Sequence, residues 1–264
     1  MESEMNKQFV VVCEDSLEGV FSAIYKLYEK KFCHEKTRLM TQECETYELF
    51  TEYISFEPDE VLAEKVIRTV IREFGEKSYT SMCYALSGTD EGKANAVYQM
   101  IVFGLKLKNK RNLINAVTND SVNQVFCLAR EAGNEVLRLK EFLRFRELEN
   151  GVLFAKIAPK HNLLTFLVPH FADRFPNENF VIYDEHRNLA AIHPAYQEYV
   201  LLHGTEYDAE LVHHFSKAEA VYAELFQLFC KTISIREREN KRLQMQMLPL
   251  RYRKYMTEFN AEYL

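Results

Sequence analysis

The stretch SIRERENKRLQMQMLPLRYRKYM, residues 234–256, combines guanidinium groups and phenol rings in a way that suits a phosphate-bearing ligand. From Arg236 to Lys254 it holds seven Lys or Arg and two Glu, a net charge of +5. The whole chain carries −6, so the rest carries −11. Arginine can donate two hydrogen bonds to a phosphate, and tyrosine can stack on a base. The predicted contacts are Arg238, Arg251, Tyr252 and Arg253.

A second interpretation makes this tail a docked part of the fold. Its arginines would pair with the acidic N-terminal third, where residues 1–64 hold fifteen Asp or Glu and six Lys or Arg. Composition alone does not choose between a free tail and a docked one. The apolar residues that would dock it are Met245, Met247, Leu248 and Leu250.

A further cationic face is expected on a β-hairpin around Asn150–Gly151, a dipeptide typical of two-residue hairpin turns. On the strands FLRFR and VLFAKIAP, one face would alternate aromatic rings with cations, as in platforms that bind single-stranded nucleic acid. The competing interpretation is a solvated sheet face whose aromatic rings are covered by a helix. The residues on this face are Phe142, Arg144, Arg146, Val152, Phe154 and Lys156.

Acid–base chemistry has three candidates, which are His161, His170 and Asp173. His170 and Asp173 lie one helical turn apart, so their side chains can reach each other and could transfer protons in an enzyme. A salt bridge or cap at a helix end is the commoner use of that spacing. The sequence assigns no catalytic residue.

Other chemistry-bearing patterns are missing from the sequence. It contains no glycine-rich phosphate loop and no Gly-x-Ser-x-Gly nucleophile motif. Cys33, His34 and Cys44 match no zinc-ligand spacing. The neighbours His213 and His214 would point about 100° apart on a helix. We therefore expect no metal site and no cofactor.

The elements that must position these residues fall into two types. The N-terminal part is expected to be mostly helical, with one short strand at Phe9–Cys13 and helices at 58–75 and 91–107. A long helix begins at Asn119 or Asp120. Its apolar residues step by three and four: Val122, Val125, Ala129, Ala132, Val136 and Leu139.

From residue 142 the apolar period changes from 3.6 to 2, and residues 142–193 are expected to order as β-β-α-β-β. The predicted fold is α+β, an antiparallel sheet with helices packed on it. A last helix from Asp208 to about Thr232 carries an apolar stripe that includes Tyr222, Leu225 and Phe229. We expect one domain over 1–264, with subdivisions at 1–110, 118–205 and 206–264.

Bulk composition places the chain among globular proteins. Of its 264 residues, 47% are apolar, which is enough for a sizeable core. No apolar run is long enough for a transmembrane helix, and the acidic start of the chain is unlike a secretory signal. Six cysteines without a Cys-x-x-Cys pair suit reduced thiols. These features predict a cytoplasmic protein without membrane contact.

Two stretches carry a family resemblance. AREAGNEVLRLKEFLRFRELENGVLFAKIAPKHNLLTFLVPHFADRF (129–175) and the tail extended to residue 259 resemble an uncharacterised bacterial family of DNA metabolism or DNA repair proteins. The resemblance covers nearly the full length. Where the family usually has His, Pro and Trp, this chain has Leu137, Lys241 and Arg253. The matched positions include Arg138, Arg144, Arg146, Pro159, Arg174, Arg238, Asn240, Pro249, Arg251 and Tyr252.

The resemblance implies a role beside DNA-repair machinery. Family genes typically neighbour one for a radical SAM DNA-repair protein, and a related domain is sometimes fused to a uracil-DNA-glycosylase-like domain. The first hypothesis is a non-catalytic accessory protein that binds single-stranded or damaged DNA, a radical SAM partner, or both. The alternatives are an enzyme acting on damaged DNA or nucleotides and a structural adaptor without nucleic-acid contact.

Overall fold

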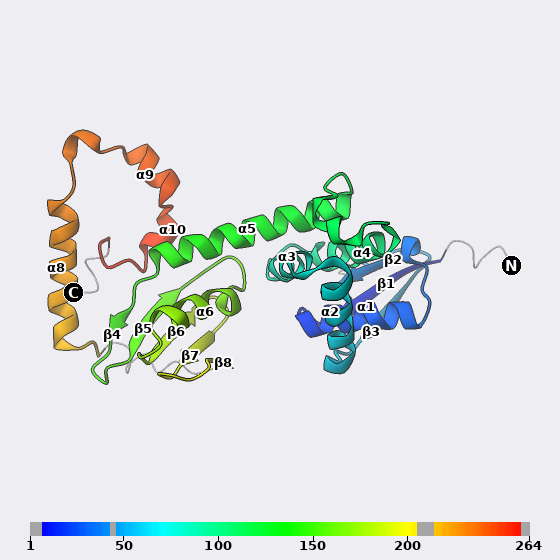
Figure 1. The fold of residues 1–264 in the computed structure, drawn as a ribbon, viewed down its shortest axis with the longest axis horizontal. Coiled ribbons are helices and arrows are strands. Elements are labelled where there is room, and N and C mark those ends of the chain that lie inside the picture. The colour runs from blue at the N-terminus through cyan, green and yellow to red at the C-terminus, as the bar shows by residue number, and fades with distance from the viewer. Residues whose placement is uncertain (1–6, 43–45, 205–213, 260–264) are drawn as a thin grey trace. The chain divides into compact units, whose positions relative to one another are not determined.

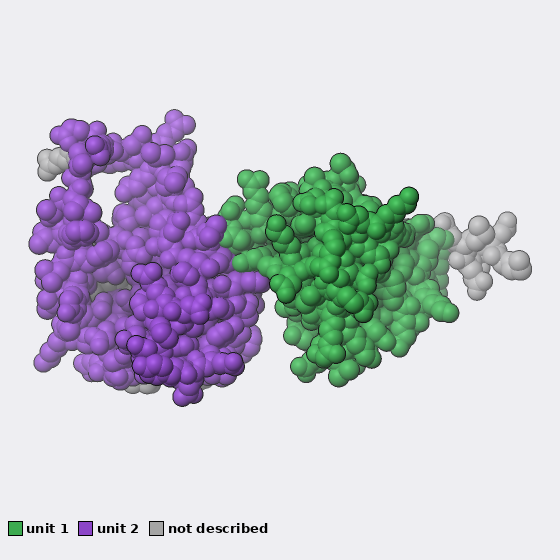
Figure 2. Space-filling view, in the orientation of Figure 1, with its two compact units in different colours: residues 1–134 green, residues 135–264 purple. Residues whose placement is uncertain are grey.

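The computed structural model describes residues 7–42, 46–204 and 214–259. The chain forms two compact units, residues 1–134 and 135–264, shown in different colours in Figure 2. The division falls inside the long helix α5 (Asp120–Phe142). A mixed α+β fold is confirmed, with helices and strands in both units (Figure 1). No helix in the described part of the chain is long and apolar enough to cross a membrane.

Unit 1 is built around a parallel sheet that the sequence only partly predicted. The strand β1 (Gln8–Cys13) lies between β2 (Thr37–Met40) and β3 (Thr51–Phe56), and both pairings are parallel. The strands β2 and β3 were not predicted from the sequence, because many polar residues surround them and no alternating apolar pattern stands out. The helical prediction for the rest of the unit is confirmed: α1 (Leu17–Glu29), α2 (Glu60–Phe74), α3 (Glu76–Leu86) and α4 (Lys93–Lys106).

Local signals fix the ends of these helices. The Ser16 hydroxyl accepts a hydrogen bond from the Gly19 amide and so caps α1. Asp59 caps α2 by accepting from the Leu62 amide. The helix ends at Gly75, whose φ of 85° is a conformation that favours glycine. Apolar faces of these helices form the core of unit 1.

Unit 2 has the predicted β-β-α-β-β order followed by a fifth strand. Its sheet runs β4 (Arg146–Glu147), β5 (Leu153–Ile157), β6 (Phe180–Asp184), β7 (Leu189–His193) and β8 (Val200–His203). The prediction of a wholly antiparallel sheet is wrong at one pair, because β5 and β6 are parallel. The helix α6 (Leu164–Arg174) carries the chain across between them, as a parallel connection requires.

The first predicted strand is also corrected. Phe142 is the last residue of α5, and the strand starts only at Arg146. The predicted helix from Asp208 begins outside the described residues, which show α8 as Lys217–Thr232. After it come a short 3-10 turn, Arg236–Arg238, and the short helices α9 (Lys241–Met247) and α10 (Leu250–Arg253).

Candidate nucleic-acid interface

Glu135 is a buried carboxylate that joins three segments of unit 2. Glu135 lies on α5, and its side chain is almost fully buried. Oε1 accepts a hydrogen bond from the Lys160 amide at 3.1 Å, and Oε2 accepts from the His161 amide at 3.0 Å. His161 Nδ1 lies 2.6 Å from Oε2, and Arg251 Nη2 lies 3.4 Å from Oε1. One carboxylate therefore holds both the loop after β5 and the helix α10.

The environment of Glu135 favours its ionised form. Burial raises the pKa of Glu135, but hydrogen bonds from the His161 ring and from the Lys160 and His161 amides, with the Arg251 charge, bring that pKa below its usual value. A lowered pKa in the folded state adds stability at pH values above the pKa of the unfolded state. Glu135 is therefore a structural anion, and His161, a candidate acid–base group, is its partner.

A second acid, Glu185, also binds residues of the tail. It pairs with Lys156 Nζ at 2.9 Å and with Lys254 Nζ at 2.9 Å. The Tyr255 hydroxyl also donates a hydrogen bond to Glu185. Burial raises the pKa of Glu185, but the hydrogen bonds from Tyr255, Lys156 and Lys254 lower it to about 2. Lys156, predicted to bind phosphate, is thus engaged inside the protein.

The shift at Glu185 predicts how stability depends on pH. A carboxyl with a pKa near 4.5 when unfolded and about 2 when folded stabilises the protein above pH 4.5 and loses this effect as the pH falls toward 2. We expect Glu185→Gln to be less stable than wild type at pH 7, with the gap narrowing from pH 4.5 to 2. Urea unfolding at several pH values in this range measures the difference in free energy of unfolding between the two proteins. A difference that stays constant with pH would contradict the lowered pKa of Glu185.

The predicted hairpin face is not an open platform. Arg144 Nη2 pairs with Glu258 Oε1 at 2.8 Å, and Arg146 Nε lies 3.4 Å from Glu219 Oε1. The Arg146 guanidinium lies 3.5 Å from the centre of the Phe215 ring. Phe154, expected to stack on a base, is buried in a small apolar cluster. This face is therefore occupied by contacts within unit 2, and Phe154 packs against residues of neighbouring strands and Phe215, not against the helix that the competing interpretation expected.

The last part of the tail is docked through residues other than those predicted. Tyr252 and Met256 are buried, and the Tyr252 ring centre lies 5.7 Å from that of Phe142. Met245 and Met247, the expected anchors, are about half exposed. Leu250, another expected anchor, is exposed, and Leu248 is partly buried. We call the docked segment, residues 250–258, the strap.

Arg253 of the strap and Arg138 of α5 also have partners within unit 2. Arg253 donates hydrogen bonds to the Leu248 carbonyl and lies over the Phe259 ring. Arg138, on α5, donates to the Met247 carbonyl. Acids of unit 2, not of the N-terminal third, pair with Arg251 and Lys254.

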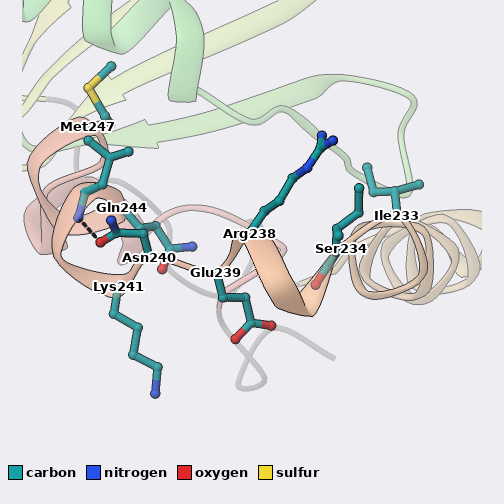
Figure 3. A pocket seen from close by; sticks show the side chains of 10 residues that line it. Ile233, Ser234, Arg238, Glu239, Asn240, Lys241, Gln244 and Met247 are labelled. Atoms are coloured by element: carbon teal, nitrogen blue, oxygen red, sulfur yellow. Dashed lines mark hydrogen bonds between the residues drawn. The ribbon is translucent and has the colours of Figure 1, made fainter.

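The preceding part of the tail forms an open groove of about 720 Å³, which we call the tail groove (Figure 3). Arg238 and Lys241 extend from it on opposite sides of the chain (Figure 3). Arg238, Lys241 and the neighbouring Arg242 are exposed and form no ion pair among the described residues. Asn240 caps α9 by accepting from the Leu243 amide. The groove is lined by Ile233, Ser234, Ile235, Arg238, Glu239, Asn240, Lys241, Leu243, Gln244 and Met247.

The candidate catalytic pair His170 and Asp173 lies on α6 without a hydrogen bond between the two side chains in the described structure. The His170 ring instead meets the edge of Phe171, with ring centres 5.1 Å apart. Burial, with Lys140 and Arg174 nearby, lowers the pKa of His170. Groups of three or more His, Cys, Asp or Glu that could hold a metal are absent from the described ranges. Cys44 lies outside them.

Comparison with known proteins identifies a family for this chain. No curated protein matches the chain. A solved structure described as a DHH domain from a member of the s1p family of ribosomal proteins aligns with 73% of this chain and 75% of its own, at 11% identity and a TM-score of 0.30. A score this low supports no shared fold. The family model for the domain of unknown function DUF4130 matches residues 91–258. Since that match covers more than half of the chain, the protein belongs to the DUF4130 family.

Proposed function

We propose that this chain is a non-catalytic accessory protein of DNA metabolism or repair that holds single-stranded nucleic acid in the tail groove. One observation carries the proposal. Of the cations predicted to bind phosphate, Arg238 lines a groove, is exposed and forms no ion pair in the described part of the chain. Lys241 shares these properties, and its neighbour Arg242 is likewise exposed and forms no ion pair among the described residues. The other predicted cations are engaged by acids, rings or carbonyls of unit 2.

The lining of the groove favours a single strand over a duplex. Ile233, Leu243 and Met247 lie beside the cations. Apolar side chains can cover the faces of unstacked bases, which a duplex hides in its stack. Cations close to such a surface hold the phosphates that connect the bases.

Charge reversal in the groove tests this proposal. We expect the triple variant Arg238→Glu, Lys241→Glu, Arg242→Glu to bind labelled oligothymidine at least tenfold more weakly than wild type, because phosphate contacts dominate such affinities. Fluorescence anisotropy measures the affinity of each protein for the oligonucleotide. The charge-matched control Lys65→Glu, Arg68→Glu, Lys77→Glu changes exposed residues of α2 and α3 and is expected to lose much less. Equal losses in both variants would sink the proposal.

The family resemblance adds a protein partner to the proposal. A radical SAM DNA-repair protein is the proposed partner, because its gene typically neighbours those of the family. Met245 and Leu250 are exposed on the tail, outside the lining of the groove, and are available for such a contact. Copurification of the two proteins, with and without Met245→Asp, tests this second element separately, because Met245 does not line the groove.

A further inference from the structure

The helix α8 has an apolar face that unit 2 does not cover. Five large side chains on it are between 54% and 67% exposed. The opposite face makes the contacts of the helix, where Ala223 is buried and Glu219 pairs with Arg146. An apolar face of this kind marks an interaction site. Its residues, which we call the α8 stripe, are Val221, Tyr222, Leu225, Leu228 and Phe229.

The stripe is large enough to pair with a copy of itself. An aromatic side chain buries roughly 150–250 Å² when fully covered and an aliphatic one somewhat less, so the five half-exposed side chains offer on the order of 500 Å². Two copies would bury about 1,000 Å², which is the lower bound for a specific interface. Neighbouring Ala218 and Thr232 on the same face would add to this area.

The spacing of the stripe is self-complementary. Val221 and Phe229 lie four residues before and after Leu225, and Tyr222 and Leu228 lie three before and after it. In an antiparallel pair centred on Leu225, Val221 meets Phe229 of the second copy, and Tyr222 meets its Leu228. Each contact then joins an aromatic ring to a smaller aliphatic side chain. The same patch serves on both copies, as two-fold symmetry requires.

We propose that the protein forms a homodimer through antiparallel pairing of α8 with α8 of a second copy, centred on Leu225. The proposal concerns a different surface from the tail groove and does not depend on nucleic-acid binding. A partner of another sequence is the alternative occupant of the stripe, and the mass of the purified chain distinguishes the two.

Sedimentation velocity of the full chain over a concentration series tests the dimer. We expect wild type to approach twice the monomer mass and Leu225→Glu to stay monomeric, with circular dichroism showing that both are folded. The control Val61→Glu, at an apolar position on α2 that is 64% exposed, is expected to dimerise like wild type. A wild type that is monomeric at every concentration would overturn the proposal, and so would a dimeric Leu225→Glu.

Disulfide trapping tests the orientation. Chains with Val221→Cys and chains with Phe229→Cys, both in a Cys230→Ser background, are mixed and oxidised. We expect peptides linked between positions 221 and 229 to exceed those linked between identical positions, as read by mass spectrometry. Links only between identical positions would show a parallel pair and contradict the antiparallel arrangement.

Discussion

Replacing Glu135 by alanine is expected to lower the free energy of unfolding of unit 2 by about 3–5 kcal/mol, because each buried polar group left without a partner costs about 1–3 kcal/mol. The change leaves the Lys160 and His161 amides and the His161 ring without their acceptor. It also removes the acid that faces Arg251. Hydrogen exchange at pH 7, followed in peptides from β5 and α6, measures the loss within unit 2.

A neighbouring acid on the same helix supplies the control. Glu141 is 59% exposed and lies 3.8 Å from Arg138, so its ion pair is weak. We expect Glu141→Ala to change stability by less than about 1 kcal/mol, as is typical of surface pairs. If Glu135→Ala were as mild as Glu141→Ala, the central place given to Glu135 in unit 2 would be wrong.

The second large effect is expected at Tyr252. Truncating a buried aromatic ring typically costs about 3–5 kcal/mol, and Tyr252→Ala also removes the contact with Phe142. Because Tyr252 and Met256 are the buried residues of the strap, the variant should release residues 250–258. Limited proteolysis should then cut the strap much faster than in wild type.

A tyrosine with an exposed ring provides the comparison. Tyr196 is 78% exposed in the same unit, so Tyr196→Ala should leave both stability and strap cleavage close to wild type. Strap cleavage that does not change in Tyr252→Ala would show that the ion pairs with Glu135 and Glu185 are sufficient to dock it.

Residue periodicity predicts much of the fold but only part of the sheets. The predicted apolar face of α5 is confirmed, because Val122, Val125, Val136 and Leu139 are all buried. The strands β2 and β3 were missed because parallel pairing with β1 depends on distant residues, and because both strands are short and only half apolar. The parallel pair β5 and β6 was misjudged for a similar reason, since two strands separated by a helix can pair either way.

The partners of the basic residues could not be predicted from the sequence. Which acid meets which arginine depends on contacts as far apart as Glu135 and Arg251, or Arg144 and Glu258. One signal was available for Glu135, which lies three residues after Ala132 and four before Leu139 and so on the buried face of α5. A charge on an apolar helix face predicts a buried partner.

The most direct test of the nucleic-acid account is the salt dependence of binding. Anisotropy titrations of labelled single-stranded DNA from 50 to 200 mM salt should give a steeper slope for wild type than for the variant Arg238→Glu, Lys241→Glu, Arg242→Glu. Each lost phosphate contact removes about 0.7 from the slope, so the difference should be about 2. Equal slopes, or no binding by wild type, would contradict the tail groove as a nucleic-acid site.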